Sequence, residues 1–262
     1  MSSLIDIGVN LTHKSFNTDC DQVVKEAQSQ GVSRMIVTGS CVERSRASLQ
    51  MAKLWPGVLY STAGVHPHDV TSCNDSTISN LRELASEKEV VAIGECGLDY
   101  FRDFSPREDQ KKWFEAQLQT AVEIELPVFL HQRDAHKDFI SILKRYIQKL
   151  PAAVVHCFTG TAEEMEESLE MGCYIGITGW ICDERRGKNL QSIVKDIPLS
   201  KLMVETDAPF LLPRDLSPKP KSNRNVPANL PHVVRTIAKH MDRSFEEVAE
   251  ASTRNAEGFF RF

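Results

Sequence analysis

The sequence predicts an α/β protein with the (β/α)8 TIM barrel fold, as a single domain over residues 1–262. Eight short apolar runs rich in β-branched residues recur along the chain, and helical patterns separate them. The length of 262 residues suits eight strand–helix units. The alternative is an open doubly wound sheet, which usually carries a Gly-rich phosphate loop. No GxGxxG, GxxxxGKS or GxxxxGKT pattern occurs, so we favour the barrel.

The predicted strands alternate with amphipathic segments along the whole chain. The strands cover residues 4–10, 35–40, 59–65, 90–97, 127–132, 153–158, 173–179 and 202–207. Segments between them, such as DCDQVVKEAQSQG and PREDQKKWFEAQLQTAVEIE, repeat apolar positions every three or four residues. Many begin at Asp, Ser or Thr and end near Gly, which is typical of helix ends.

An irregular stretch follows the eighth predicted strand. Residues 211–231, LLPRDLSPKPKSNRNVPANLP, contain too many prolines and polar residues for a helix. We expect this stretch to lie over the C-terminal mouth of the barrel, because it follows a strand. Two helices then close the chain, 228–241 after Pro227 and 244–258 with a capping box of Ser244 and Glu247.

The composition is that of an ordinary soluble protein, with 41% hydrophobic and 26% charged residues. No window approaches the roughly 18 apolar residues of a membrane span, so we expect no membrane partner. The N-terminus lacks a signal-peptide pattern, and the seven scattered cysteines fit reduced thiols, so we expect a cytoplasmic protein. We also expect a monomer. The net charge of −5 argues against general coating of nucleic acid, although residues 185–188 and 214–224 are basic.

Polar residues end several of the apolar strands on the face that should point inward. Alternation along residues 90–97 places Ile93 and Glu95 on one face and Cys96 on the other. The same reasoning gives a convergent set at the carboxyl ends of four strands: Glu95, His131, His156 and Asp207. Barrel enzymes place their active sites at this rim, so these residues predict a site.

The chemistry of the set favours a metal ion. One histidine near a strand end is more often structural, but an ionised carboxylate in apolar surroundings is destabilising by several kcal/mol without a partner. The inward positions of these strands carry no Lys or Arg that could pair with Glu95. Two imidazoles with two carboxylates are ligands that a borderline or hard divalent ion prefers.

Several residues around this set remain open between a functional and a structural role. Glu205 lies one layer deeper, where it would orient a ligand histidine or serve as a structural carboxylate. Trp180, at the mouth end of the seventh strand, would stack on a base or simply pack. Basic residues on the loops would clamp an anionic substrate or form a solvated face: Arg133, Arg214, Lys219, Lys221 and Arg224.

At this point the motifs resemble those of the TatD family of metal-dependent deoxyribonucleases. The resemblance is carried, in order along nearly the whole chain, by GVHPH, AIGECGLDY, PVFLHQRDAH, VVHCFTGT, YIGITGW, ETDAPFLLPR and RNVPANLPH. It implies a metal-dependent hydrolase domain that cleaves phosphodiesters with Mg²⁺. It further implies 3′ to 5′ exonuclease action on single-stranded DNA and on RNA, with a link to repair of oxidative DNA damage.

The resemblance also implies roles for individual residues. Glu95 would bind or bridge metal ions, while His131 and His156 would be ligands. Asp207 would complete the metal site or take a proton from the attacking water, and His66 would help hold the scissile phosphate. We expect further substrate contacts from Asn10, His68, Arg133, Trp180 and Arg224.

The first strand departs from the pattern of many relatives. They carry two histidines in a D-x-H-x-H pattern, where this chain has Gly8 and Asn10 after Asp6. Gly8 has no ligand atom and Asn10 offers only an amide oxygen. We therefore predict one strong metal site at Glu95 and its two histidines, with a second site that is weak or formed only with substrate. Fewer nitrogen donors favour Mg²⁺ or Mn²⁺ over Zn²⁺.

Two other functions remain as alternatives. A metal-dependent amidohydrolase acting on a small molecule uses the same barrel and similar ligands, but commonly needs the missing first-strand histidines. A non-catalytic barrel that only binds nucleic acid or protein would leave the inward Glu95 and Asp207 unexplained, so we rank it last.

Overall fold

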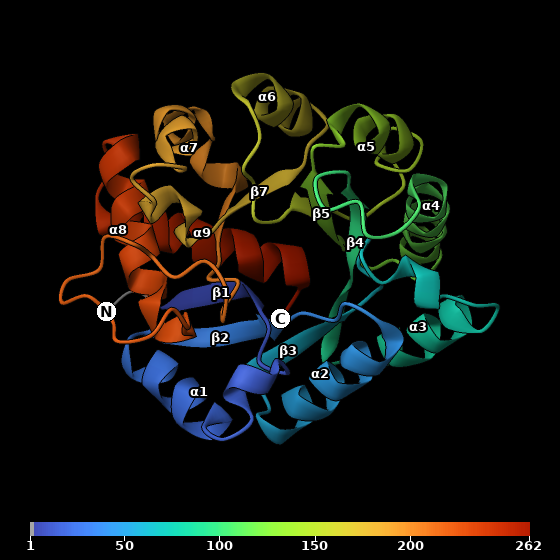
Figure 1. The fold of residues 1–262 in the computed structure, drawn as a ribbon, viewed down its shortest axis with the longest axis horizontal. Helices are drawn as coiled ribbons and strands as arrows, with labels where there is room; N and C mark the ends of the chain where they lie inside the picture. Colours follow the sequence, from blue (N-terminus) through green and yellow to red (C-terminus); the bar gives the residue numbers. More distant parts are fainter. Residues whose placement is uncertain (1–2) are drawn as a thin grey trace. The chain divides into compact units, whose positions relative to one another are not determined.

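The structure is a computed structural model that describes residues 3–262, and strands alternate with helices along them (Figure 1). Within this range one sheet holds the strands in the order β1 to β8, with parallel pairing. This alternation and strand order are those of a (β/α)8 barrel, so the predicted fold class is confirmed.

All eight predicted strands are present, with shifted ends. They are Leu4–Val9 (β1), Val32–Val37 (β2), Leu59–Ala63 (β3), Val90–Asp99 (β4), Val128–Arg133 (β5), Ala153–Val155 (β6), Tyr174–Ile177 (β7) and Leu202–Val204 (β8). His156 and Asp207 therefore lie just beyond their strands rather than within them. Beyond β8 the backbone leaves the regular ladder, since Thr206 N donates to a side chain, Asp6 Oδ1 (2.9 Å), and Asp207 has a φ of 52°.

The helices follow the predicted pattern. They are Cys20–Ser29 (α1), Val42–Leu54 (α2), Thr77–Ala85 (α3), Arg107–Glu123 (α4), His136–Leu143 (α5), Ala162–Glu170 (α6), Lys188–Ile193 (α7), Leu230–Met241 (α8) and Phe245–Phe260 (α9). The predicted capping box is confirmed, because Glu247 N donates to Ser244 Oγ (3.2 Å) and Ser244 N to Glu247 Oε2 (2.8 Å). Along residues 3–262, no helix is both long and apolar enough to cross a bilayer.

The chain divides into two compact units. The terminal unit holds residues 3–36, 157–162 and 175–262, and the central unit holds residues 37–156 and 163–174. The single-domain organisation stays a prediction.

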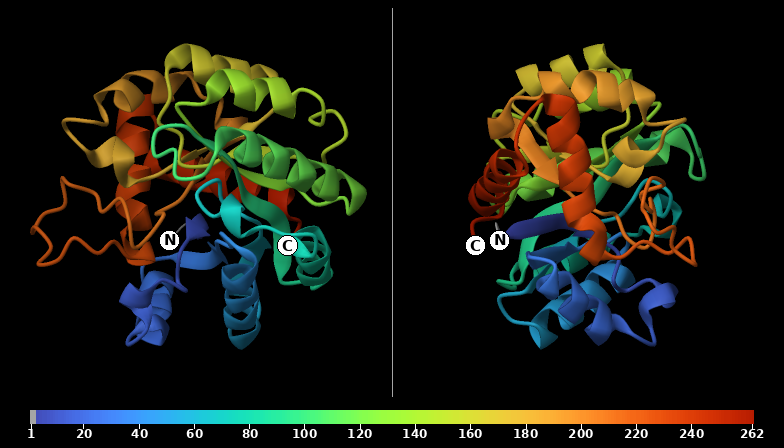
Figure 2. Two further views of the ribbon diagram at one scale, coloured as in Figure 1. Left: turned by 45° about the vertical axis from the view of Figure 1, so that its right-hand side comes forward. Right: turned by 90° about the vertical axis from the view of Figure 1, so that its left-hand side faces the viewer.

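In the terminal unit, β1 and β8 are joined side by side. Asp207 N donates to Gly8 O (2.9 Å) and Asn10 N to Ala208 O (2.7 Å). The Asp6 side chain is fully buried and bonds Thr206, while α9 packs on both strands. Figure 2 shows residues 205–229, between β8 and α8, as a long loop that extends away from α8. The predicted irregular stretch is therefore present.

In the central unit, β3 to β6 are neighbours, with α2 to α5 on the outer side (Figure 1). The pairing of β4 with β5 contains a bulge, since Gly94 pairs with Phe129 and Cys96 already with Leu130. Glu95 is the extra residue. We predicted that Ile93 and Glu95 share one face of this strand and that Cys96 lies on the other. The placement of Ile93 was wrong, because the register puts Ile93 and Cys96 on the same face. The bulge turns Glu95 away from both residues.

Glycines permit this close pairing of β4 and β5. Gly94 and Gly97 have φ values of +144° and +147°, which L side chains rarely adopt. A Cβ at Gly94 would clash with Phe129 O, and a Cβ at Gly97 with His131 O. The two glycines thus let β5 approach on either side of Glu95.

Asp6 should give the protein a pH-dependent stability. Burial raises its pKa from 3.8 to about 8, so the folded state keeps a proton that the unfolded chain releases. Its contribution is complete below about pH 4 and is lost as the pH rises to about 8, at about 1.4 kcal/mol per pH unit. The free energy of unfolding, measured with urea, should decline less steeply from about pH 5 to about pH 7 for Asp6→Asn than for wild type. Equal slopes would contradict a protonated Asp6.

Candidate active site

The carboxylate of Glu95 is the centre of a polar cluster in the central unit. Its backbone N donates to Gly39 O (2.7 Å), which fixes the bulged residue, and the whole residue is 8% exposed. Three imidazole nitrogens converge on the single oxygen Oε1. They are His156 Nε2 at 2.8 Å, His131 Nδ1 at 2.9 Å and His66 Nε2 at 3.2 Å.

The three histidines come from strands that surround β4 in the sheet. His131 belongs to β5, His156 follows β6 directly, and His66 follows β3 after the loop residues Gly64 and Val65. His156 N still donates to Leu130 O (2.9 Å), which places this residue one step past its strand. Parallel strands bring their carboxyl ends to one edge of a sheet, so residues far apart in sequence meet here.

Asp99 is a site residue that the sequence reasoning missed. It is 1% exposed, and Oδ2 lies 2.8 Å from His68 Nε2 and 3.1 Å from His131 Nε2. His131 is thus held between two carboxylates, Glu95 at Nδ1 and Asp99 at Nε2. Burial acts to raise the pKa of Asp99, but hydrogen bonds with His131 and His68 hold it well below the usual range. The available signal was the motif GLDY, since β4 extends to Asp99 rather than ending at residue 97.

The pKa shifts follow from burial and from these contacts. Burial acts to raise the pKa of Glu95, but the charges of His156 and His66 and hydrogen bonds with His131 and His156 hold it well below its ordinary value. Burial lowers the pKa of His66 to about 4, against the attraction of Glu95. At neutral pH, Glu95 is therefore ionised and His66 is neutral, and metal ligands need these protonation states.

The donor atoms fit a divalent ion. His66, Glu95 and His131 each offer one ligand atom, and these atoms all lie within 4.8 Å of one another. His156 Nε2 contacts the same Glu95 oxygen and extends the set. Imidazole nitrogens with a carboxylate oxygen are ligands for Zn²⁺, Mn²⁺ and similar ions. His66 thus lies among the candidate ligands, while its predicted role at the scissile phosphate stays a prediction.

The remaining predicted residues of the central unit are His68 and Arg133, and Arg133 lies at the end of β5. Its guanidinium carbon lies 3.8 Å from the ring centroid of Phe101. His68 Nε2 bonds Asp99 Oδ2 (2.8 Å), and its predicted substrate contact stays a prediction.

The terminal unit holds the other predicted residues. Asn10 Nδ2 donates to Asp207 Oδ1 (2.9 Å), so these two form a pair. Glu205 is fully buried and accepts from Cys157 N (2.6 Å), which is a contact to backbone. Arg224 pairs with Asp19 (2.7 Å) and also donates to Ser15 O (2.7 Å).

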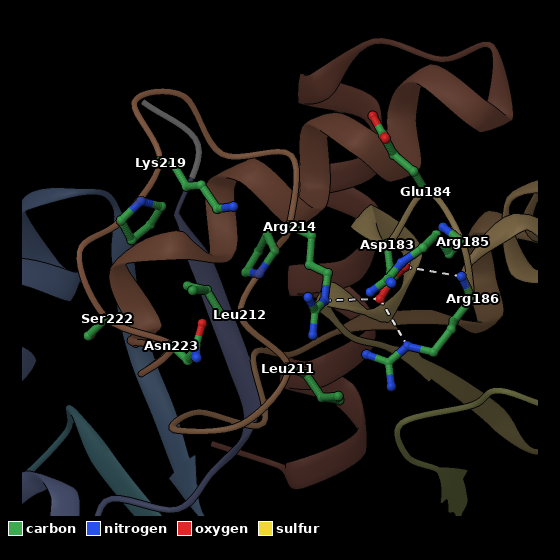
Figure 3. A pocket seen from close by; sticks show the side chains of 12 residues that line it. Asp183, Glu184, Arg185, Arg186, Leu211, Leu212, Arg214, Lys219, Ser222 and Asn223 are labelled. Atoms are coloured by element: carbon green, nitrogen blue, oxygen red, sulfur yellow. Dashed lines mark hydrogen bonds and ion pairs between the residues drawn. The ribbon is translucent and has the colours of Figure 1, made fainter.

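Trp180 lies beside a basic pocket in the terminal unit. The guanidinium carbon of Arg186 lies 4.5 Å from the Trp180 ring centroid, and the indole Nε1 donates to Arg186 O (3.2 Å). The pocket has a volume of about 420 Å³. Figure 3 shows its lining side chains on the loop after β7 and on the loop after β8. Its cationic lining is Arg185, Arg186, Arg214 and Lys219. Asp183 pairs with Arg186 (3.0 Å) and Arg214 (3.1 Å). Asp183 and Glu184 are the acidic residues of the lining, so its four cations leave an excess of positive charge.

Asp99 should set the titration of His131. Burial acts to lower the pKa of His131, but hydrogen bonds with Asp99 and Glu95 raise it. In metal-free protein, Asp99→Asn should therefore make His131 lose its proton at a lower pH than in wild type. Nitrogen NMR of the imidazole, recorded as a function of pH, measures this titration. Asp138→Asn is the matched control, because Asp138 accepts from Tyr100 (2.8 Å) outside the cluster. An unchanged His131 titration in Asp99→Asn would show that Asp99 does not set the pKa of His131.

Comparison with known proteins places the chain in a family. Residues 5–261 match the family described as TatD related DNase. A 3′-5′ ssDNA/RNA exonuclease TatD from Citrobacter rodentium is 51% identical over 257 residues, covering 98% of this chain and 97% of the relative. The protein of that name from Pectobacterium carotovorum is 49% identical over 258 residues, covering 98% and 99%.

Solved structures agree with this assignment. The TatD homologue YJJV from Escherichia coli has a TM-score of 0.90 and 29% identity, covering 99% of this chain and 98% of that one. A TatD family hydrolase from Entamoeba histolytica has a TM-score of 0.88 and 27% identity, covering 99% of both chains. The chain therefore belongs to the TatD related DNase family.

Proposed function

We propose that this protein is a metal-dependent phosphodiesterase that removes nucleotides from the 3′ end of single-stranded DNA and RNA. The observation that carries the proposal is the convergence of three imidazoles on the buried carboxylate of Glu95. The names of the similar exonucleases support the substrate and the direction of cleavage. Family membership favours this activity over the amidohydrolase and non-catalytic alternatives.

The ligands we propose are Glu95, His131, His156 and Asp207. Glu95 supplies a permanent negative charge, because its neighbours hold its pKa low. Asp99 fixes the ring of His131 through Nε2 and so directs Nδ1 toward Glu95. A bound divalent ion, Mg²⁺ or Mn²⁺, supplies Lewis acidity that neutralises the phosphoryl oxygens and lowers the pKa of water.

Proton transfer is assigned to Asp207. Asn10 Nδ2 donates to Oδ1 and orients the carboxylate, which we assign to accept a proton from the attacking water. The water oxygen bonds to phosphorus in line while the bridging oxygen of the phosphodiester leaves. His66, neutral at pH 7 because burial lowers its pKa to about 4, contacts the scissile phosphate as a neutral donor. Asn10 thus acts through Asp207 where relatives with the D-x-H-x-H pattern have a histidine.

Substrate binding is assigned to a local group of positive charges, although the net charge of the whole chain is −5. The basic pocket of the terminal unit is built from arginines and a lysine whose charges suit backbone phosphates. Arg224 is committed to Asp19, so we assign it to holding its loop, with a weaker contribution to substrate binding. The repair role, the cytoplasmic location and the monomeric state stay predictions.

Cleavage should require both the metal and the two carboxylates. We expect purified protein to shorten single-stranded DNA and RNA from the 3′ end with Mg²⁺ or Mn²⁺, and to stop in chelator. Glu95→Gln and Asp207→Asn should each lose about 100-fold or more in kcat, since each removes charge at the reacting centre. Glu257→Gln, at a surface ion pair with Arg34, is the matched control. Full cleavage in chelator, or in both variants, would overturn the proposal.

Calorimetric titration should reveal one tight metal site. Gly8 and Asn10 supply no imidazole, so a second ion should bind only weakly to the free protein. Glu95→Gln should remove most of the binding heat, because it removes the charged ligand. Two equally tight sites in the wild-type protein would refute the one-site prediction.

A further inference from the structure

Two exposed aromatic side chains lie on the connection between β4 and α4, directly after Asp99. Phe101 is 54% exposed and Phe104 is 66% exposed. Along residues 3–262 the other large exposed hydrophobic side chains are Leu54 and Phe210. Two exposed phenylalanines on one short segment make a larger apolar surface than a single scattered residue, so they suggest a surface that binds something.

Arginines accompany both rings. The guanidinium carbon of Arg133 lies 3.8 Å from the ring centroid of Phe101, within cation–π distance. That of Arg102 lies 5.9 Å from Phe101 and 6.0 Å from Phe104. Flat apolar rings with interleaved guanidinium groups match both parts of a nucleic acid single strand, the bases and the phosphates.

A continuous series of contacts joins this surface to the candidate active site within the central unit. The Phe104 ring lies 4.8 Å from the His68 ring, and His68 Nε2 bonds Asp99 Oδ2 (2.8 Å). Asp99 in turn bonds His131, which contacts Glu95. A base on Phe104 would thus lie two side chains, His68 and Asp99, away from His131, which we propose as a metal ligand.

Buried hydrogen bonds hold the segment in place. Asp99 Oδ1 accepts from Arg102 N (2.8 Å), and Ser105 Oγ donates to His68 O (3.0 Å). The fully buried Gln110 donates to Ser105 O (2.8 Å) and accepts from Asp99 N (2.9 Å). The rings are therefore exposed on a fixed backbone, and little ordering is needed when a ligand binds.

We propose that Phe101 and Phe104, with Arg102 and Arg133, form a stacking platform for unpaired nucleobases next to the scissile phosphodiester. The inference deepens the proposed nuclease function and rests on it. Bases in a duplex are already stacked and paired, so the platform selects single strands and frayed 3′ ends. It assigns a binding role to the two phenylalanines and gives Arg133 a defined contact.

The binding test uses the full chain in chelator, which prevents cleavage. A single-stranded DNA with 2-aminopurine near its 3′ end should change fluorescence on binding as the base stacks. Phe101→Leu and Phe104→Leu should each lose this signal and weaken binding by about 10-fold. Phe101→Tyr and Phe104→Tyr should keep it, because an aromatic face remains. Leu54→Ala, exposed on α2, is the control and should behave as wild type.

An abasic substrate provides a second readout that a structural defect would not mimic. Removing the 3′-terminal base should weaken binding by the wild-type protein. Binding by Phe104→Leu should change little when the base is removed, because this variant has already lost the ring on which the base stacks. In cleavage assays, the Leu variants should lose at least about 10-fold more kcat/KM on single-stranded DNA than on bis(p-nitrophenyl) phosphate, which has no base.

The outcomes separate the two proposals. If the Leu variants bind and cleave single strands as wild type does, the platform is wrong while the nuclease function stands. If wild type shows the 2-aminopurine signal but no metal-dependent cleavage, the nuclease function fails and the base-binding surface stands. Loss of the signal in the Tyr variants as well would show that the segment does not act by stacking.

Discussion

The central unit depends on one interaction, the buried charge of Glu95 against three imidazoles. An ionised carboxylate in a nearly closed environment needs several partners, and His66, His131 and His156 supply them from three neighbouring strand ends. The β4 bulge and the glycines on either side of it make this geometry possible. The glycines let β5 approach closely, and the bulge leaves Glu95 unpaired in the ladder. In the proposed function, a divalent ion would complete the compensation of charge.

Asp99 extends the cluster in two directions. Through His131 it acts on the candidate metal ligands, and through its bonds with His68 and Arg102 N it fixes the segment that carries the exposed phenylalanines. One buried carboxylate therefore couples the orientation of a ligand histidine to the position of a surface that suits nucleobases. If both proposals hold, chemistry and substrate recognition share a single hydrogen-bonded framework.

The terminal unit shows how a departure in the first strand is accommodated. Asp6 is buried and bonded to Thr206, so it joins β1 to the segment after β8. Asn10, in place of a histidine, bonds the Asp207 carboxylate. Asp6 and Asn10 thus serve as partners of the segment that follows β8. The same unit also holds the basic pocket, whose positive charge would suit a phosphate backbone in the proposed function.

The sequence by itself determined the order of strands and helices, the capping box at Ser244 and the polar residues at strand ends. These features follow from local periodicity and local hydrogen bonding, which a short window of residues contains. Tertiary structure decided the bulge at Glu95, the place of Asp99 beside His131, the His66 contact and the pairing of Arg133 with Phe101. Each depends on the register between strands or on side chains distant in sequence, and alternation along one strand carries no information about its neighbour.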